Sequence, residues 1–243
     1  MADLRGMSHD GQLQFETMEQ DVEAALLAAQ RRAEHLFQLV VDEGLIRPGL
    51  LESELSKQIY ALASDRIGVR RHWHKRIVRA GPNSVLGYHA DPPDRRIAED
   101  DCVYLDFGPV FGEWEADFGR TYVVGNDPRK HQLVADIESA FRAGKALYRR
   151  EPDLTTGALY DFVSSLAAQR GWVFGAPTAG HLIGHFPHET TPGVPKPLSI
   201  RPGNTLRLRE PDAHGAPRHW ILEIHFVDRQ RAFGGFFEEL LTV

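Results

Sequence analysis

The sequence has a single cysteine, Cys102, in 243 residues, so an internal disulfide framework is excluded and no oxidising compartment is needed. It has no apolar run near the ~20 residues that cross a bilayer. It also lacks the charged-then-apolar start of a secretory signal. Positive charge is not in excess, because 28 Lys and Arg stand against 34 Asp and Glu. Neither nucleic acid nor membrane is therefore expected as a partner, and the cytoplasm is the expected location.

The chain is long enough for one large domain with a sizeable core. Residues 1–15 are polar and are expected to be loose. From about Glu16 to Glu43, apolar residues recur at three- and four-residue steps, which predicts an amphipathic helix. Further elements are expected at these places: a helix opening at Arg47-Pro48-Gly49, a strand over residues 73–80, and helices after Asp127-Pro128 and Thr155-Thr156.

Two acidic residues lie in the stretch 103–125, where two runs rich in Val, Tyr, Leu and Phe flank a turn. This pattern predicts a β-hairpin, with Asp106 on one run and Asp117 on the other. A carboxylate inside an apolar strand is costly unless its charge is compensated. One such residue is most often a hydrogen-bonded structural group. Two on paired strands indicate ligands to a hard or borderline cation.

A second pair of acidic residues lies near the end of the sequence. The apolar runs 220–227 and 236–241 contain Glu223 and Glu238. With a turn at Gln230-Arg231 these two residues would be cross-strand neighbours, where like charges destabilise a sheet. A bound cation removes that repulsion, so each hairpin is expected to bring two carboxylates together around a cation.

Histidines are concentrated between the two hairpins. The stretch AGHLIGHFPHE holds His181, His185 and His188. One histidine among apolar neighbours is usually a packed core residue, but three so close beside small residues favour a metal or catalytic role. His89, in GYHADPPDR, lies in a proline-containing loop, where solvent exposure is as good an interpretation as a functional one.

The order of these motifs resembles the metallopeptidase family of methionine aminopeptidases, aminopeptidase P and prolidases. The matching pieces are LDFG with Asp106, EADFGRT with Asp117, GHLIG with His181, PHE with His188, and a Glu-acid pair with Glu238. GPNSVLGYH resembles the approach to a further active-site histidine, here His89. The wording around GPN and DFG is closer to the prolidase and aminopeptidase P branch than to methionine aminopeptidases.

The resemblance implies the pita-bread fold, an α+β architecture with a curved antiparallel sheet flanked by helices. It implies one catalytic domain over residues 16–243. The separate N-terminal domain of aminopeptidase P and many prolidases, which helps to close the substrate site and assemble the oligomer, is not expected here. A homodimer is the expected assembly.

The resemblance also implies a site with two divalent cations, Mn, Co, Zn or Fe. The implied metal ligands are Asp106, Asp117, His181, a central Glu, and Glu238, with Asp117 and Glu238 bridging. Water between the two cations becomes the bridging hydroxide that attacks the peptide bond. His89 and His188 would hydrogen-bond to the amide and the tetrahedral intermediate. The implied activity is that of an exopeptidase on short peptides, at Xaa-Pro bonds.

Two positions depart from the family pattern or leave a choice. Leu182 stands where the family has glycine after the metal-binding histidine, which narrows that part of the pocket. The central Glu has two candidates. Glu210, in REP, has the family's Glu-Pro pattern and a family-like distance from His181, whereas Glu223 lies in the better strand and can pair with Glu238. We favour Glu223.

Two other functions fit the same resemblance. One is a creatinase-like hydrolase of a non-peptide C–N bond, and the other is a binding protein that kept the fold and lost catalysis. Creatinase-like relatives lack the complete ligand set, and inactive members usually replace ligands with neutral residues. Five ligands can be named in this sequence, which favours the peptidase.

Overall fold

The computed structural model of the chain describes residues 9–188 and 198–242. Its framework is a seven-stranded sheet with the order β1-β2-β5-β9-β8-β6, in which β7 also pairs with β8 and all the pairs are antiparallel. The strands of this sheet are β1 (Ile77–Ala80), β2 (Cys102–Phe107), β5 (Phe118–Val123), β6 (Val173–Phe174), β7 (Leu182–Ile183), β8 (His219–Asp228) and β9 (Phe233–Leu240). A separate hairpin of β3 (Val110–Phe111) and β4 (Trp114–Glu115) connects β2 to β5.

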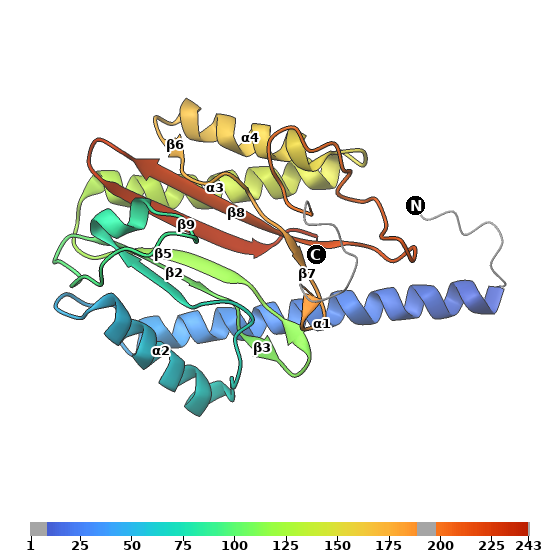
Figure 1. Cartoon of the computed structure of the whole chain (residues 1–243), viewed down its shortest axis with the longest axis horizontal. Helices are drawn as coiled ribbons and strands as arrows, with labels where there is room; N and C mark the ends of the chain where they lie inside the picture. Colours follow the sequence, from blue (N-terminus) through green and yellow to red (C-terminus); the bar gives the residue numbers. More distant parts are fainter. Residues whose placement is uncertain (1–8, 189–197, 243) are drawn as a thin grey trace.

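Helices pack against one face of the sheet, with α3 and α4 toward the top of the view in Figure 1 and α1 and α2 toward the bottom. Their bounds are α1 (His9–Asp42), α2 (Glu52–Ile67), α3 (Pro128–Arg150) and α4 (Thr156–Gln169), and a 3-10 helix, η1 (Gly81–Val85), follows β1. Within the described part of the chain, none of the helices has an apolar stretch long enough to cross a membrane.

Two expected helix starts are wrong. α1 begins at His9, so residues 9–15 are helical rather than loose, and residues 1–8 lie outside the described part of the chain. Helix propagation adds one hydrogen bond per residue once a turn exists, so a helix can extend beyond its apolar stripe. α2 begins at Glu52 rather than near Pro48, because Glu54 caps it by accepting the Leu51 N–H at 2.9 Å. The predicted caps of α3 and α4 are confirmed, since Asp127 and Thr155 accept backbone N–H groups of the first turns.

The alternation of side chains along the strands decides which face is core. Val103, Leu105 and Phe107 of β2 pack into the hydrophobic cluster that includes α1 and α2. Alternate residues of β8, including Leu222, pack into the cluster that includes α3 and α4. Successive strand side chains point to opposite faces, so Asp106, next to Leu105 and Phe107, lies on the face opposite the helices.

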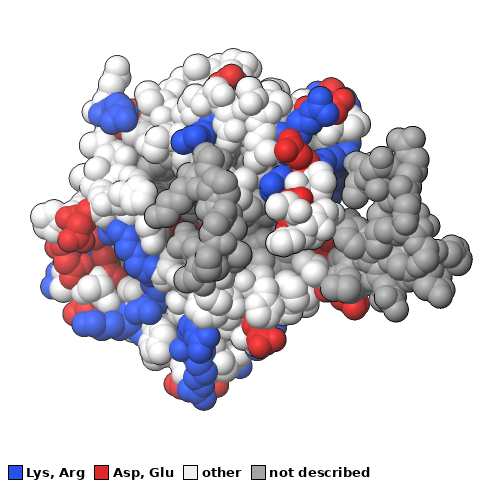
Figure 2. Space-filling view, turned by 45° about the vertical axis from the view of Figure 1, so that its right-hand side comes forward, with Lys and Arg blue, Asp and Glu red and all other residues white. Residues whose placement is uncertain are grey.

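The surface carries charge of both signs. Figure 2 shows one face of the molecule, where basic and acidic side chains lie next to one another around regions without charge. Ion pairs within the chain account for part of this mixture, such as Arg66 with Glu43 and Arg142 with Glu138. Exposed pairs of this kind contribute little to stability, so the fold depends on the two large apolar clusters.

Candidate metal centre

Four residues form a row across the middle of the sheet. Asp106 on β2 is the Cα partner of Gly119 on β5, and Gly119 is the partner of Glu238 on β9. Glu238 is in turn the partner of Glu223 on β8, which confirms the predicted pairing of these two residues. Side chains of direct partners share a face. The row therefore gathers three carboxylates on the face opposite the helices.

Gly119 leaves room between the carboxylates of the row. A Cβ at this position would lie 2.5 Å from a ring carbon of Phe236 and 3.0 Å from the Cβ of Glu238. Because Gly119 has no side chain, Asp106 and Glu238 can face each other across β5. The glycine of the ADFGR motif is thus a packing requirement of the site.

Asp117 directly precedes β5, and each of its oxygens meets a different imidazole. Its Oδ2 lies 3.1 Å from Nε2 of His181, and its Oδ1 lies 3.0 Å from Nε2 of His74. His181 also lies 3.3 Å from Glu223, and His74 lies 3.5 Å from Asp106. These contacts join both hairpins and the histidine segment into one cluster, which we call the carboxylate–imidazole cluster.

His74 was missed by the sequence reasoning. Residues 73–80 were expected to form a strand, but β1 begins only at Ile77, and the preceding residues turn toward the site. The backbone N–H of Trp73 donates to the carbonyl of Gly108 at 2.9 Å. A Cβ at Gly108 would clash with the rings of both Trp73 and His74. Gly108 of LDFG leaves the space for these rings, but the sequence alone does not say which side chains fill it.

Burial and charge shift the pKa values of the cluster in opposite directions. Burial, with the neighbouring carboxylates, raises the pKa of Glu238 well above its usual value, and burial raises that of Asp106 to about 7. Burial also acts to raise the pKa of Asp117, but the two imidazoles outweigh it and lower this pKa. Against burial, the carboxylates raise the pKa of His74 to about 9 and that of His181 to about 10. The cluster thus holds four carboxyl groups, those of Asp106, Asp117, Glu223 and Glu238, against two imidazoles.

The residues of the cluster fit divalent cations. Oε2 of Glu238 is buried and has no hydrogen-bond partner among the described residues, a costly arrangement for a carboxylate. Within the described chain, two groups have ligand atoms that all lie within 4.8 Å of one another: His74, Asp106 and Asp117, and then Asp117, His181 and Glu238. The groups share Asp117. Carboxylates with imidazole suit Mn, Fe, Co and Zn, and a cation would satisfy the Glu238 oxygen.

His188 lies beside the cluster and is held by Glu115 of β4. Its Nδ1 is hydrogen-bonded to Oε2 of Glu115, and its backbone N–H donates to Oε1 at 3.2 Å. Its ring is parallel to that of His181, with the ring centroids 6.2 Å apart, and Trp73 packs edge-on against both. Glu115 is only 1% exposed. Its spacing of two from Asp117 in EWEAD could have indicated a side chain on the same side.

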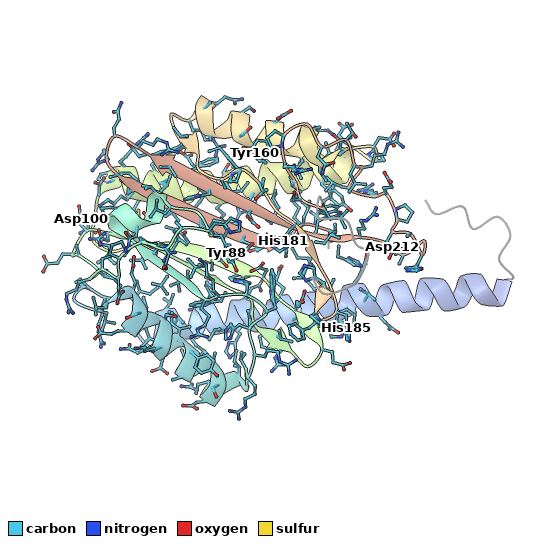
Figure 3. All side chains as sticks on the ribbon, viewed as in Figure 1. Tyr88, Asp100, Tyr160, His181, His185 and Asp212 are labelled. Atoms are coloured by element: carbon cyan, nitrogen blue, oxygen red, sulfur yellow. The ribbon has the colours of Figure 1, made fainter. Side chains whose placement is uncertain are left out.

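His89 lies outside the cluster. It is exposed and packs edge-on against Tyr88, whose ring packs in turn against His74. Figure 3 shows Tyr88 and His181 in the middle of the view and His185, two residues beyond β7, farther from them. His185 contacts Glu113, and both side chains are more than half exposed. Of the three histidines in AGHLIGHFPHE, the structure therefore places His181 among the carboxylates and His188 beside it. His185 lies away from them.

The two candidates for the central Glu lie in different environments. Glu223 is in the row of partners, 3.3 Å from His181. Glu210 is exposed in a turn, and its backbone carbonyl accepts a hydrogen bond from Arg218 at 2.6 Å. Only Glu223 contacts the carboxylate–imidazole cluster.

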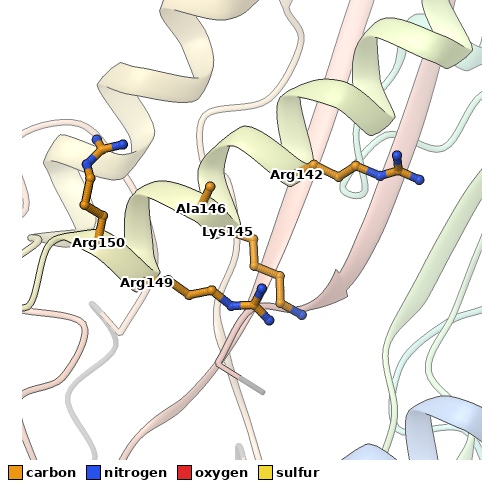
Figure 4. A pocket seen from close by; sticks show the side chains of 5 residues that line it. All are labelled: Arg142, Lys145, Ala146, Arg149 and Arg150. Atoms are coloured by element: carbon orange, nitrogen blue, oxygen red, sulfur yellow. The ribbon is translucent and has the colours of Figure 1, made fainter.

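A basic hollow lies elsewhere on the surface, along α3. Its lining residues are Arg142, Lys145, Ala146, Arg149 and Arg150 (Figure 4). α3 packs on β8 through Gly144, where a Cβ would lie 2.9 Å from the Leu222 side chain. Leu222 and Glu223 are successive residues of one strand and point to opposite faces. The basic hollow and the cluster therefore belong to opposite sides of the sheet.

An antiparallel sheet with helices on one face and clustered carboxylates and imidazoles on the other defines the class of metal-dependent hydrolases with the pita-bread fold. The profile of metallopeptidase family M24 matches residues 24–243. The chain belongs to this family, which confirms the resemblance inferred from the motifs.

Individual relatives agree with this assignment. An Xaa-Pro dipeptidase from Pyrococcus horikoshii is 26% identical over 145 residues, covering 59% of this chain and 40% of the relative. The crystal structure of prolidase from Thermococcus sibiricus is similar with a TM-score of 0.71 at 20% identity, covering 92% of this chain and 59% of that one. Methionine aminopeptidase from Rickettsia prowazekii gives 0.66 at 16% identity, covering 90% and 96%. The structural likenesses show the shared fold, and the chain spans less than two thirds of the dipeptidase and the prolidase.

Proposed function

We propose that this protein is a dinuclear metal-dependent exopeptidase that hydrolyses short peptides at Xaa-Pro bonds. The observation that carries the proposal is the row of Asp106, Glu238 and Glu223, with Asp117 and His181 beside it. In this row one buried oxygen of Glu238 has no hydrogen-bond partner among the described residues. The preference for proline rests on the similarity to the Xaa-Pro dipeptidase and the prolidase.

The cations would be held by Asp106, Asp117, His181, Glu223 and Glu238, with Asp117 and Glu238 shared between them. Glu223 takes the central position because it contacts His181, whereas Glu210 is exposed. When bound, two such cations supply an activated water as the nucleophile and polarise the scissile carbonyl. Mn, Co, Zn and Fe all suit this donor set.

His188 is assigned to hydrogen bonding with the substrate. The Glu115 carboxylate can only accept, so the Nδ1 of His188 is the donor in their hydrogen bond and the ring tautomer is fixed. The Nε2 side of the ring would then be the side that hydrogen-bonds to the substrate amide and to the tetrahedral intermediate. His89, which is exposed and lies next to Tyr88, keeps its predicted role of hydrogen bonding to the substrate.

The test combines metal analysis with a substrate panel. Protein purified without chelator should contain about two metal ions per chain. It should hydrolyse Xaa-Pro dipeptides or longer Xaa-Pro peptides in preference to Met-peptides and small amidines. Asp106→Asn and Glu238→Ala should abolish turnover.

Each alternative has its own outcome in this panel. Hydrolysis of amidines alone would indicate the creatinase-like reaction. Metal binding without turnover of any substrate would indicate a binding protein. Absence of metal, even after soaking with Mn or Co, would overturn the proposal.

We also propose a homodimer and a cytoplasmic location. Metalloenzymes of this size commonly form symmetric pairs. Light scattering over a range of protein concentrations tests the dimer, and fractionation of the source cells tests the location. A monomer at all concentrations would contradict the first, and recovery outside the cytoplasm the second.

A further inference from the structure

The proposed ligand set contains one histidine, yet a second imidazole lies on the other oxygen of the same carboxylate. We propose that His74 is a second histidine ligand, so that each cation is held by one imidazole. His74 and Asp106 would hold one cation and His181 and Glu223 the other, with Asp117 between them. This inference rests on the proposed function and adds a ligand to the set that the family resemblance implies.

The two histidines have the same hydrogen-bond arrangement. Nδ1 of His74 lies 2.7 Å from the carbonyl oxygen of Lys75, and Nδ1 of His181 lies 2.6 Å from that of Leu182. A carbonyl oxygen only accepts, so Nδ1 is the donor in both rings. Nε2 is then the nitrogen that faces Asp117 in both. Histidines that bind metals are commonly fixed in this way, with the other ring N–H held by a carbonyl or carboxylate.

The ligand atoms around His74 are close enough for one cation. Nε2 of His74 lies 3.0 Å from Oδ1 of Asp117 and 3.5 Å from Oδ1 of Asp106. Ligand atoms bound at about 2.0–2.2 Å to one tetrahedral ion lie about 3.3–3.6 Å apart, which is close to the spacing found here. Asp117 offers a different oxygen to each imidazole, as a carboxylate shared by two cations does.

The position of His74 is fixed by its surroundings. Its side chain is only 6% exposed. Gly108 leaves the space for the ring, and Trp73 packs edge-on against it with centroids 4.4 Å apart. Trp73 is itself held by the hydrogen bond from its Nε1 to the carbonyl of Ala116, directly before Asp117, at 3.0 Å. The ring is thus positioned from the same segment that supplies the shared carboxylate.

A purely structural role is the competing interpretation, in which His74 stays an imidazolium paired with Asp117 and Asp106. In that role it would repel a cation rather than bind one. The two interpretations differ in the number of imidazoles bound to metal, two against one. They differ also in metal preference, because a second imidazole favours Co, Fe and Zn over Mn.

The first experiment counts bound imidazoles in the unmodified protein. The full chain is stripped with a chelator and loaded with Co²⁺, and the exchangeable N–H protons shifted by the paramagnetic ion are recorded by NMR in H₂O and D₂O. Two such signals are expected, from the Nδ1–H groups of His74 and His181. A single signal with two bound Co²⁺ ions would overturn the inference and leave the proposed function intact. Failure to bind Co²⁺ would overturn both.

The second experiment measures Co²⁺ affinity by titration calorimetry. His74→Ala should weaken one of two sites by at least about tenfold, the lower end of the losses seen even for supporting partners of a ligand. Gly108→Ala should weaken the same site, because its Cβ displaces the His74 ring without removing it. The matched controls are His185→Ala, an exposed histidine, and Gly87→Ala, where a Cβ meets nothing within 4 Å.

The calorimetric outcomes are decisive in combination with the NMR count. Loss of one site in His74→Ala with normal binding in both controls supports the inference. Unchanged affinities at both sites in a folded His74→Ala protein would overturn it. If that variant does not fold, the Gly108→Ala titration and the count of shifted N–H signals still decide.

Discussion

Glu223 and Glu238 are direct Cα partners across β8 and β9, with both carboxylates on the face of the sheet opposite α3. Such a pair is repulsive when both groups are ionised. Within the described chain, neither residue forms a salt bridge with a lysine or arginine, and Nε2 of His181 lies 3.3 Å from Glu223. The metal-free protein therefore carries a strain that a cation would relieve, and this strain is measurable as stability.

Glu238→Gln is expected to stabilise the metal-free protein and to destabilise the metal-loaded one. Without metal, the change removes a buried carboxyl group whose pKa is raised, so that folding at neutral pH costs either a buried charge or the uptake of a proton. Its removal should raise the free energy of unfolding by about 1–3 kcal/mol. With metal, it removes a shared ligand, so the stabilisation by bound cations is lost. Urea unfolding with chelator and with saturating Mn²⁺ gives both values.

Glu239→Gln is the matched control, since it is the next residue of β9 and forms an ion pair with Arg120. It should lower stability by a similar amount in both conditions, because the lost ion pair does not involve the metal. A Glu238→Gln protein less stable than the unmodified one in chelator would contradict the interpretation of the row as a cation site.

The register of this pair could be predicted from the sequence, whereas His74 could not. Alternation has a period of two, and the turn between β8 and β9 is short, so few registers place both apolar faces in the core. His74 contacts Asp117, which is 43 positions away in the sequence. His74 lies in an irregular segment before β1, where no periodicity applies. The strand expected there begins only at Ile77. The residues before it are held by single hydrogen bonds, such as the one from the backbone N–H of Trp73 to Gly108, and not by a continuous series of strand hydrogen bonds.

The helix starts show the same difference between local and long-range signals. Asp127 and Thr155 cap their helices through residues two and three positions away, so the sequence suffices. His89 was selected through a family motif, and the structure places it one ring farther from the carboxylates than His74. Motif similarity fixes a segment, but side-chain direction depends on packing against distant residues such as Gly108.

Gly119→Ala is expected to weaken both the fold and the metal site. The new Cβ would lie 2.5 Å from the Phe236 ring and 3.0 Å from the Cβ of Glu238, and neither is the flexible end of a side chain. Overpacking of this kind costs about 1–3 kcal/mol. The shift of Glu238 should also lower Co²⁺ affinity. Gly87→Ala is the control for both measurements, and equal behaviour of the two variants would contradict the role assigned to Gly119.

His219 on β8 should make stability depend on pH. Burial lowers its pKa, and its Nδ1 has no hydrogen-bond partner among the described residues. In the unfolded chain the histidine takes up a proton near its usual pKa of about 6.5, whereas the folded protein resists protonation. The contribution is therefore fully present above pH about 6.5 and is lost as the pH falls below it.

His219→Leu is expected to reduce this loss. The free energy of unfolding in chelator, measured in urea at pH 7.5 and at pH 5.5, should fall less for the variant than for the unmodified protein. His185→Ala serves as the control, because that histidine is more than half exposed. The same fall in His219→Leu and the unmodified protein would assign the acid sensitivity to other groups.

Glu115→Gln is expected to lower kcat on Xaa-Pro peptides by about 10- to 100-fold, the range for partners that orient a functional histidine. The carboxylate accepts two hydrogen bonds from His188, one from Nδ1 and one from the backbone N–H. A glutamine has one acceptor oxygen and a donor amide, so one of these bonds is lost and the ring tautomer is no longer fixed. Metal content should stay unchanged, because Glu115 belongs to neither group of ligand atoms.

Glu113→Gln is the matched control, an exposed acid of the same hairpin that contacts His185. The variant should keep normal kcat and metal content. A fall in metal content with Glu115→Gln would mean that Glu115 supports the cations rather than His188. A kcat equal to that of the control would instead remove His188 from the reaction, since the tautomer that Glu115 fixes would then have no consequence for turnover.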